Sequence, residues 1–299
     1  MPPTRPGQVR SPRRSPCRIV VLCDNEAAPG AAGPACGSEW GLALAIDLGS
    51  GPEGGGQKDG GVWLWDAGQT DLFLRNAARL GVDVGAARGL GLSHGHYDHT
   101  GGLAALLAGT PFSGAVYAHP ACASARYAEG RDGGPRRAIG PPHPLPPFLP
   151  VGPLTELAPG LTMLTDIPRA PGFFQAVSGF SLDPAGREPD PVPDDAFLVL
   201  DSASGPVVIL GCCHSGLANS LACLRERLGL DRVFAVLGGL HLFKAGPQAL
   251  EETAQALEAF GVRRLIAGHC TGPDRLALLH QRLPGREVLP LAAGQTWDF

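Results

Sequence analysis

Leu92-Ser-His-Gly-His-Tyr-Asp-His-Thr-Gly-Gly102 is the stretch that decides the fold of this 299-residue chain. His94 and His96 are two residues apart, so on an extended chain their side chains point the same way. Asp98 shares that parity but His99 does not, so the four side chains can converge only if the chain turns after His96. Three imidazoles and a carboxylate gathered at a strand end suit Zn²⁺, Fe or Mn²⁺, which take nitrogen and oxygen ligands. The stretch therefore predicts a metal site.

Around this stretch, short apolar runs alternate with helical patterns along the whole chain. The expected strands are residues 18–23, 42–48, 62–65, 115–118, 196–200, 207–210, 233–237, 264–267 and 287–289. The expected helices are residues 71–80, 217–228, 247–260 and 274–283. Strands and helices mixed in this way indicate an α/β layered fold.

The overall composition is that of a globular protein and gives no electrostatic indication of a nucleic-acid or polyanion partner. Hydrophobic residues make up 44% and charged residues 17%, and the formal net charge is −4, which argues against a nucleic-acid partner and leaves a small-molecule substrate. No apolar run approaches the roughly 18 residues that cross a bilayer, and no signal peptide is recognisable. The eight cysteines are scattered without a CxxC pair, so we expect reduced thiols, a cytoplasmic location and no membrane contact.

Two segments differ from the rest of the chain. Residues 1–16 are proline-rich and carry four arginines, and we expect a basic disordered tail there. The remainder, residues 17–299, is expected to be one domain. Within it, residues 131–195 contain 15 of the 30 prolines and show little periodicity, which predicts a long insertion acting as a loop or cap beside an active site.

Other motifs carry a resemblance to a known family. Asp66-Ala-Gly68 follows an expected strand. His214 follows a second expected strand, and His269, in Gly268-His-Cys-Thr-Gly272, follows a third. With the histidine-rich stretch, these residues resemble the metallo-β-lactamase superfamily. Leu22-Cys-Asp-Asn25, Gly211-Cys-Cys-His-Ser-Gly216 and Gly238-Gly-Leu-His-Leu242 are similar to one subgroup, which is named for 7,8-dihydropterin-6-methyl-4-(β-D-ribofuranosyl)aminobenzene-5′-phosphate synthase.

The resemblance implies a four-layer αββα sandwich with two divalent metal ions at the strand ends. Zn²⁺ is the first choice of metal, with Mn²⁺ and Fe²⁺ as alternatives. One implied ligand set is His94, His96 and His214, and the other is Asp98, His99 and His269. Asp98 would also be catalytic, by orienting the water that becomes a metal-bound hydroxide. The implied activity is that of a hydrolase or group-transfer enzyme acting on a small molecule, with a pterin or phosphoribosyl-aminobenzene compound as the lead.

The chain departs from the superfamily pattern at one position. Many dinuclear members place a bridging aspartate where this chain has Gly211-Cys-Cys-His214, and no acidic residue occurs between Asp201 and Glu226. The second site is then weaker, bridged by solvent, or supplied with a thiolate by Cys212. Alternatively, His214 is displaced and another histidine completes the first site.

The remaining candidates have structural readings beside their functional ones. Asp24 either orients a ligand histidine or makes an Asx turn. His119 either lines the groove or belongs to the core, and His241 favours a core or supporting role over ligation. Further candidates for support or substrate binding are Asn25, Asp66 and Cys270, and we expect Cys270 to pack against the metal pocket.

Three other functions remain open at this point. A phosphodiesterase or nuclease is favoured weakly by the basic tail, while the acidic balance and Tyr97 argue against it. Redox di-iron relatives usually carry glutamate in place of His96. A non-catalytic metal-binding sensor would keep the same ligands. Residue order carries no signal for the oligomeric state.

Overall fold

Two seven-stranded sheets face each other in the computed structural model, which describes residues 16–29, 35–49 and 60–299. The expected basic tail lies outside these residues except for Pro16. In spatial order, the first sheet consists of β17 (Thr296–Asp298), β1 (Arg18–Cys23), β2 (Ala43–Asp47), β3 (Val62–Trp65), β4 (Gly89–Gly91), β5 (Ala115–Ala118) and β8 (Leu149–Pro150). The second consists of β16 (Glu287–Pro290), β15 (Arg264–Gly268), β14 (Ala235–Gly239), β13 (Gly205–Leu210), β12 (Phe197–Ser202), β10 (Leu161–Leu164) and β9 (Leu154–Ala158).

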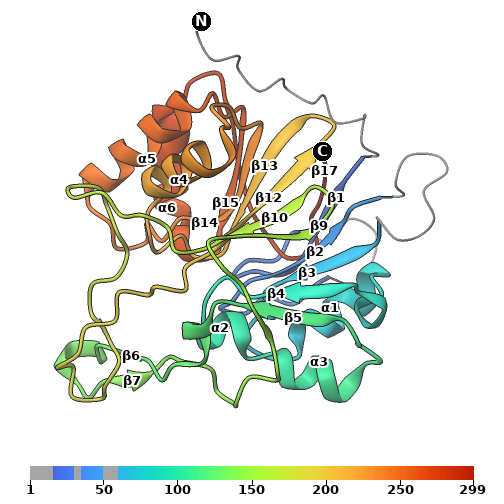
Figure 1. Cartoon of the computed structure of the whole chain (residues 1–299). Helices are drawn as coiled ribbons and strands as arrows, with labels where there is room; N and C mark the ends of the chain where they lie inside the picture. The colour runs from blue at the N-terminus through green and yellow to red at the C-terminus, as the bar shows by residue number, and fades with distance from the viewer. Residues whose placement is uncertain (1–15, 30–34, 50–59) are drawn as a thin grey trace, which may run out of the picture.

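Helices and a small third sheet complete the described chain. The α-helices are α1 (Leu72–Leu80), α2 (Tyr97–Thr100), α3 (Leu103–Gly109), α4 (Leu217–Leu228), α5 (Pro247–Ala259) and α6 (Pro273–Arg282). Short 3₁₀ turns are η1 (Val84–Ala86), η2 (Pro120–Ala123), η3 (Arg131–Gly133) and η4 (His269–Thr271). The third sheet joins β11 (Phe180–Ser181), β6 (Tyr127–Ala128) and β7 (Arg137–Ala138), and its strands β6 and β7 lie apart from the large sheets (Figure 1).

Alternating side chains divide the core into three apolar layers. In β1, Ile19 and Val21 pack between the two sheets, while Val20 and Leu22 pack under α1 and α3. In β13 the same alternation directs one set of residues between the sheets and the other toward α4, α5 and α6. Because every strand of this kind is apolar on both faces, helices must cover the outer faces. The result is the predicted αββα sandwich, with α4–α6 on one outer face (Figure 1).

Parallel strands near the centre of each sheet bring several loops to one edge. β13, β14 and β15 are parallel to one another, and so are β3, β4 and β5. The carboxyl ends of parallel neighbours meet at the same edge, which is where ligands bind in open α/β sheets. The segments 92–102, 211–216 and 268–272 follow β4, β13 and β15. Topology therefore gathers motifs that are far apart in the chain.

Most expected elements are present, with ends shifted by one or two residues. Helix α4 has the predicted bounds. β4 was not predicted, because its sequence is only Gly-Leu-Gly. A Cβ on Gly89 would lie 2.5 Å from the Trp63 ring and one on Gly91 2.9 Å from the Trp65 ring. The tryptophans of β3 thus occupy the space that apolar side chains of β4 would fill.

Part of the proline-rich segment 131–195 is regular structure. β9 and β10 lie within it, and β10 pairs along its whole length with β12 of the second sheet. Leu161, Met163 and Leu164 are fully buried. The many prolines of this segment predicted a loop. The two strands form because the prolines lie outside them.

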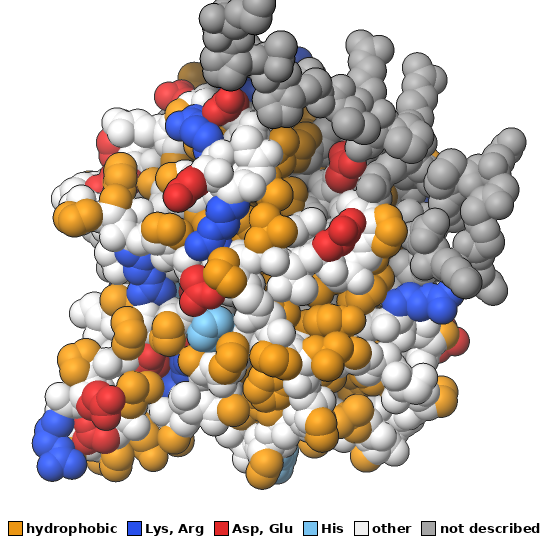
Figure 2. Space-filling model, in the orientation of Figure 1, with side chains coloured by type: hydrophobic (Ala, Val, Ile, Leu, Met, Phe, Trp, Pro, Cys, Tyr) orange, Lys and Arg blue, Asp and Glu red, His pale blue; other side chains and the backbone are white. Residues whose placement is uncertain are grey.

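The lengths of the helices and the charges on the surface indicate whether the described chain could cross a membrane or bind a nucleic acid. No helix in the described part of the chain is long and apolar enough to cross a membrane. On the face that Figure 2 shows, basic and acidic side chains are interspersed among the described residues. That face therefore lacks the broad basic patch that binds a nucleic-acid backbone.

Candidate metal centre

The histidine-rich stretch turns where the sequence predicted. His96 is still extended, with φ −78° and ψ 150°, and α2 begins at the next residue. His94 and His96 therefore lie in the loop after β4, while Asp98 and His99 lie in the first helical turn. All four side chains are buried. The change from extended chain to helix brings His99 to the same side as the other three.

Two further loops reach this point from the second sheet. Cys212 and His214 follow β13, and His269 follows β15. Cys213 has φ 60° and His269 has φ 49°, in the left-handed region that non-glycine residues rarely adopt. The turn at Cys213 directs its own thiol toward the Ser220 hydroxyl, 3.6 Å away. Strained residues of this kind concentrate at functional sites.

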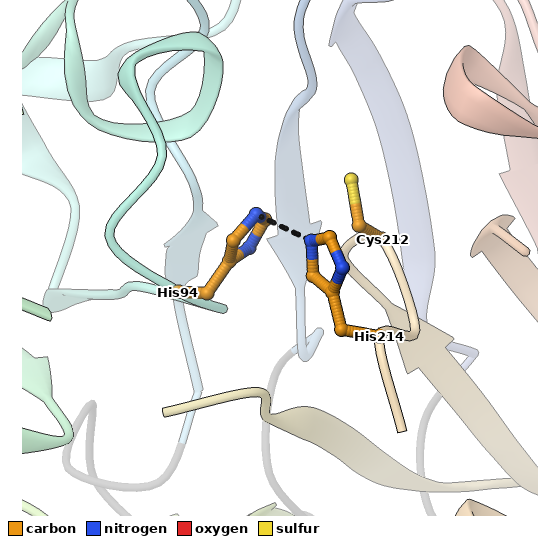
Figure 3. Close-up of side chains that lie close together, drawn as sticks. All are labelled: His94, Cys212 and His214. Carbon is orange, nitrogen blue, oxygen red and sulfur yellow. Dashed lines mark hydrogen bonds between the residues drawn. The ribbon is translucent and has the colours of Figure 1, made fainter. Parts of the chain in front are cut away.

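Five histidines and one cysteine form two adjoining groups. In the first, His94 Nε2 lies 3.2 Å from His214 Nε2 and 3.0 Å from His96 Nδ1. Figure 3 shows the rings of His94 and His214 facing each other, with Cys212 beside them. In the second, His99 Nε2 lies 3.2 Å from His269 Nε2, which is 3.6 Å from an Asp98 oxygen.

Cys212 belongs to both groups. Its Sγ lies 3.2 Å from His99 Nε2 and 3.3 Å from His269 Nε2. The ligand atoms of His94, Cys212 and His214 lie within 4.8 Å of one another, and so do those of His99, Cys212 and His269. The thiol thus lies between the two groups.

The other ring nitrogens of these histidines are held by hydrogen bonds. Nδ1 of His99 lies 2.7 Å from an Asp66 oxygen, and Nδ1 of His269 lies 3.0 Å from Asn25 Oδ1. Nδ1 of His214 lies 2.7 Å from the Ala176 carbonyl oxygen, to which it can donate. Partners of this kind fix the tautomer and the ring orientation of metal-ligating histidines. They leave Nε2 of these three histidines, each with a lone pair, directed at the centre.

The charge state of the histidines fits a metal site. Burial lowers the pKa of His94, His96, His214 and His269 well below the ordinary value, so these rings are neutral. Neutral imidazole is the form that binds a metal ion. The buried Nε2 of His96 has no hydrogen-bond partner among the described residues. A divalent cation would satisfy ring nitrogens that face one another in this way, beside a buried ring nitrogen that has no partner among the described residues.

The pKa values of His99 and Asp98 are shifted upward, the opposite direction from those of the four neutral rings. Burial lowers the pKa of His99, but the carboxylates of Asp66 and Asp98 outweigh it, so the net direction is upward. Burial raises the pKa of Asp98, although a hydrogen bond from Trp40 favours its charged form. Negative charge is therefore concentrated around His99, where it offsets the charge of a bound cation.

The candidates with supporting roles fall into distinct places. Asn25 makes two contacts with His269: its Oδ1 lies beside the ring Nδ1, and its Nδ2 donates to the His269 carbonyl oxygen at 3.0 Å. Asp24 accepts the backbone N–H of Glu26 at 3.1 Å, which is the Asx turn. Asp66 holds His99 and also accepts the Ser93 N–H at 2.7 Å.

Three candidates lie around the centre or away from it. The ring of His241 lies 4.6 Å from that of His214, and burial lowers its pKa to about 4. The Cys270 thiol is buried and accepts the His241 N–H at 3.3 Å. His119 caps η2 by accepting the Ala121 N–H, and its Nε2 faces Asp166 at 3.3 Å. The structure therefore brings His241 and Cys270 to the centre and places His119 in a capping contact.

Sequence reasoning missed several residues that contact the centre. The Ser93 hydroxyl lies 2.9 Å from His94 Nδ1, and its place beside the first histidine is the signal that could have indicated it. The ring of Trp40 lies 5.6 Å from that of His269. Asp194 and Asp195 bind the backbone of two ligand loops. No local pattern marks these last three residues.

Comparisons with known proteins agree with the architecture. The family described as "Metallo-beta-lactamase superfamily" matches residues 57–269. A Methanocaldococcus jannaschii protein named 7,8-dihydropterin-6-methyl-4-(beta-D-ribofuranosyl)-aminobenzene-5'-phosphate synthase is 26% identical over 67% of this chain and 71% of its own. The crystal structure of Tm1679, described as a metal-dependent hydrolase of the beta-lactamase superfamily, superposes with a TM-score of 0.76 at 26% identity, covering 95% of this chain and 99% of that one. The Bacillus subtilis protein YhfI shares the fold, with a TM-score of 0.54 at 14% identity over 95% of this chain and 100% of its own.

Proposed function

The chain belongs to the metallo-beta-lactamase superfamily, and we propose that it is a metal-dependent enzyme that hydrolyses or transfers a group of a small-molecule substrate. The observation that carries this proposal is the pair of adjoining ligand groups that share Cys212. Both groups are buried, and both present neutral imidazole nitrogens. A structural zinc site would be a single closed tetrahedron, usually rich in cysteine.

Two divalent metal ions are proposed for this centre. His94, His96 and His214 would hold one, and Asp98, His99 and His269 would hold the other. Cys212 lies between the two sets. Thiolate and imidazole ligands suit Zn²⁺ better than Mn²⁺, which prefers oxygen. Zn²⁺ is therefore the first metal to test.

Asp98 is the proposed catalytic residue of the centre. Divalent ions in such a pair supply Lewis acidity and activate water near neutral pH. The Asp98 carboxylate lies beside both His269 and His99 and is 6% exposed. Burial raises its pKa, so its ionised form is a stronger proton acceptor. Asp98 would hold a reacting water in position and accept its proton.

The substrate proposed is a pterin or phosphoribosyl-aminobenzene compound. The name of the Methanocaldococcus jannaschii relative supplies the lead. Two exposed aromatic side chains support it: Trp40 is 44% exposed and Phe243 is 55% exposed. Their rings lie 6.4 Å apart, and Trp40 also contacts His269. Exposed rings beside a reactive centre can stack on a flat heteroaromatic ring.

Metal content is the direct test of the proposed centre. Protein purified without chelator is expected to contain about two metal ions per chain by mass spectrometry. His214→Ala is expected to reduce this to about one, because it removes a ligand of one set. His280→Ala, an exposed position on α6, is the control and should keep both ions. A His214→Ala protein with the full wild-type content would contradict the ligand assignment.

Cobalt substitution tests whether Cys212 is a ligand. Co²⁺-loaded protein is expected to show a thiolate-to-cobalt charge-transfer band in the near ultraviolet, because the Cys212 thiol lies against ligand nitrogens of both sets. Cys212→Ser should abolish the band. Cys213→Ser is the matched control, since that neighbouring thiol faces Ser220 instead. Persistence of the band in Cys212→Ser would exclude Cys212 as the ligand.

A further inference from the structure

Two adjacent aspartates end the proline-rich segment and are almost completely buried. Asp194 is 0% exposed and Asp195 is 1% exposed. They precede β12 in the second sheet, and neither belongs to a proposed ligand set. A buried carboxylate needs hydrogen-bond donors or a cation to compensate its charge. The positions of those donors show what the pair does.

Asp194 binds the loop that carries His94 and His96. Its Oδ2 accepts the backbone N–H of Gly95 at 2.7 Å. This loop fits closely, because a Cβ at Gly95 would lie 2.1 Å from the Cys122 carbonyl oxygen. The carboxylate therefore fixes the peptide between two proposed ligands.

Asp195 binds the loop that carries the third ligand of the same set. Its Oδ1 accepts the backbone N–H of His214 at 3.0 Å, and its Oδ2 accepts that of Ser215 at 2.6 Å. Ala176, which also lies within residues 131–195, donates its N–H to the His214 carbonyl oxygen at 2.8 Å. His214 is thus held by backbone and side-chain contacts from one segment.

One arginine binds Asp194, and a second fixes the chain just before the two aspartates. Arg126 is 1% exposed; its Nη2 lies 2.6 Å from Asp194 Oδ1 and donates to the Ala121 carbonyl oxygen at 3.0 Å. Arg169 donates to the Val192 carbonyl oxygen at 2.7 Å and to the Ser215 hydroxyl at 3.1 Å. Arg169 therefore links the chain just before the two aspartates to the loop that carries His214 and Ser215.

We propose that Asp194 and Asp195 are positioning residues for the metal set His94, His96 and His214, so that the proline-rich segment is a structural part of the metal centre. The set that contains Asp98, His99 and His269 receives no hydrogen bond from either aspartate among the described contacts. Loss of either carboxylate would release one ligand loop and weaken one metal ion selectively. The inference rests on the proposed function for its metal, while the loop contacts are observed directly.

The experiment uses Asp194→Asn and Asp195→Asn in the full chain, with Zn²⁺ competition against a chelator. Each is expected to weaken one of the two Zn²⁺ ions by about 10- to 100-fold, the usual effect of removing a partner of a ligand, and to leave the other within about threefold. Asp183→Asn is the matched control, because Asp183 in the same segment accepts the N–H groups of Ala185, Arg187 and Glu188 in its own turn and not those of a ligand loop. Asp190→Asn controls for the Arg126 contact, since Asp190 lies 3.4 Å from that guanidinium.

Hydrogen exchange measured without metal separates this inference from the proposed function. Peptides covering residues 93–96 should lose protection in Asp194→Asn, and those covering residues 212–216 should lose it in Asp195→Asn. Unchanged protection of both loops would overturn the inference even if the protein binds two metal ions. Equal weakening of both ions, or the same effect in Asp190→Asn, would also overturn it by showing a general structural role. If Asp194→Asn does not fold, Asp195→Asn decides, because its hydrogen bonds go to the 214–215 backbone and not to Arg126. Wild-type protein that binds no Zn²⁺ overturns the proposed function instead.

Discussion

Asp98→Ala is expected to lower kcat/KM by about a thousandfold while the protein stays folded. Removal of a positioned proton acceptor typically costs 10²- to 10⁴-fold. The side chain is almost buried and lies beside ring nitrogens of the second proposed metal set. Its loss therefore affects both the position of a reacting water and the acceptance of its proton. The apolar layers of the core lie away from this position, so the fold should persist.

The measurement is turnover of a panel of phosphoester and pterin substrates, with circular dichroism as the test of folding. Asp83→Ala is the control, because Asp83 is an exposed residue that caps η1. It should retain wild-type turnover. Metal content is measured in the same samples, since Asp98 is also a proposed ligand. Activity in Asp98→Ala above about a tenth of wild type would contradict the catalytic role.

Removal of the metal ions is expected to lower the melting temperature by roughly 10 °C. Binding at a thousandfold excess over Kd is worth about 4 kcal/mol, and each kcal/mol shifts the melting temperature by about 2–4 °C in chains somewhat shorter than this one. Without a cation, histidine ring nitrogens face one another at 3.0–3.2 Å in a buried site. A bound cation would accept their lone pairs, so its removal leaves buried polar atoms poorly compensated.

Calorimetry of chelator-treated protein, before and after Zn²⁺ is restored, measures this shift. His94→Ala provides the comparison, because a variant that lacks one ligand should respond less to the chelator. Equal melting temperatures in the treated and restored wild-type protein would contradict a stabilising metal centre. Recovery with Zn²⁺ but not with Mg²⁺ would agree with nitrogen and sulfur ligands.

Much of the fold is encoded in short-range patterns. Apolar runs such as β1 are continuous because both of their faces are buried, and the length of these runs distinguishes them from helices. β4 escaped prediction because the Trp63 and Trp65 side chains occupy its surface, so glycine replaces the usual apolar residues. β9 and β10 were not predicted, because their alternation of apolar and polar residues is short and lies among many prolines. Contacts between elements, not local preference, determine these strands.

The site shows the same division between local and long-range information. The histidine-rich stretch identifies four candidates because they lie within six residues of one another. The place of Cys212 depends on a left-handed turn at Cys213, which nothing in the local sequence requires. Asp24 and Asn25 could not be distinguished either, since the amide reaches His269 only after β1 and β15 are assembled. Asp194 acts through a peptide 99 positions away.

The proposed ligands come from opposite sides of the sandwich. His94, His96, Asp98 and His99 follow β4 of the first sheet, whereas Cys212, His214 and His269 follow β13 and β15 of the second. Within the first sheet, β17 pairs with β1, although the two strands are far apart in the sequence. Neither sheet alone holds a full set, so each set is complete only after the two sheets have packed together. Metal uptake would therefore follow the packing of the two sheets and not precede it.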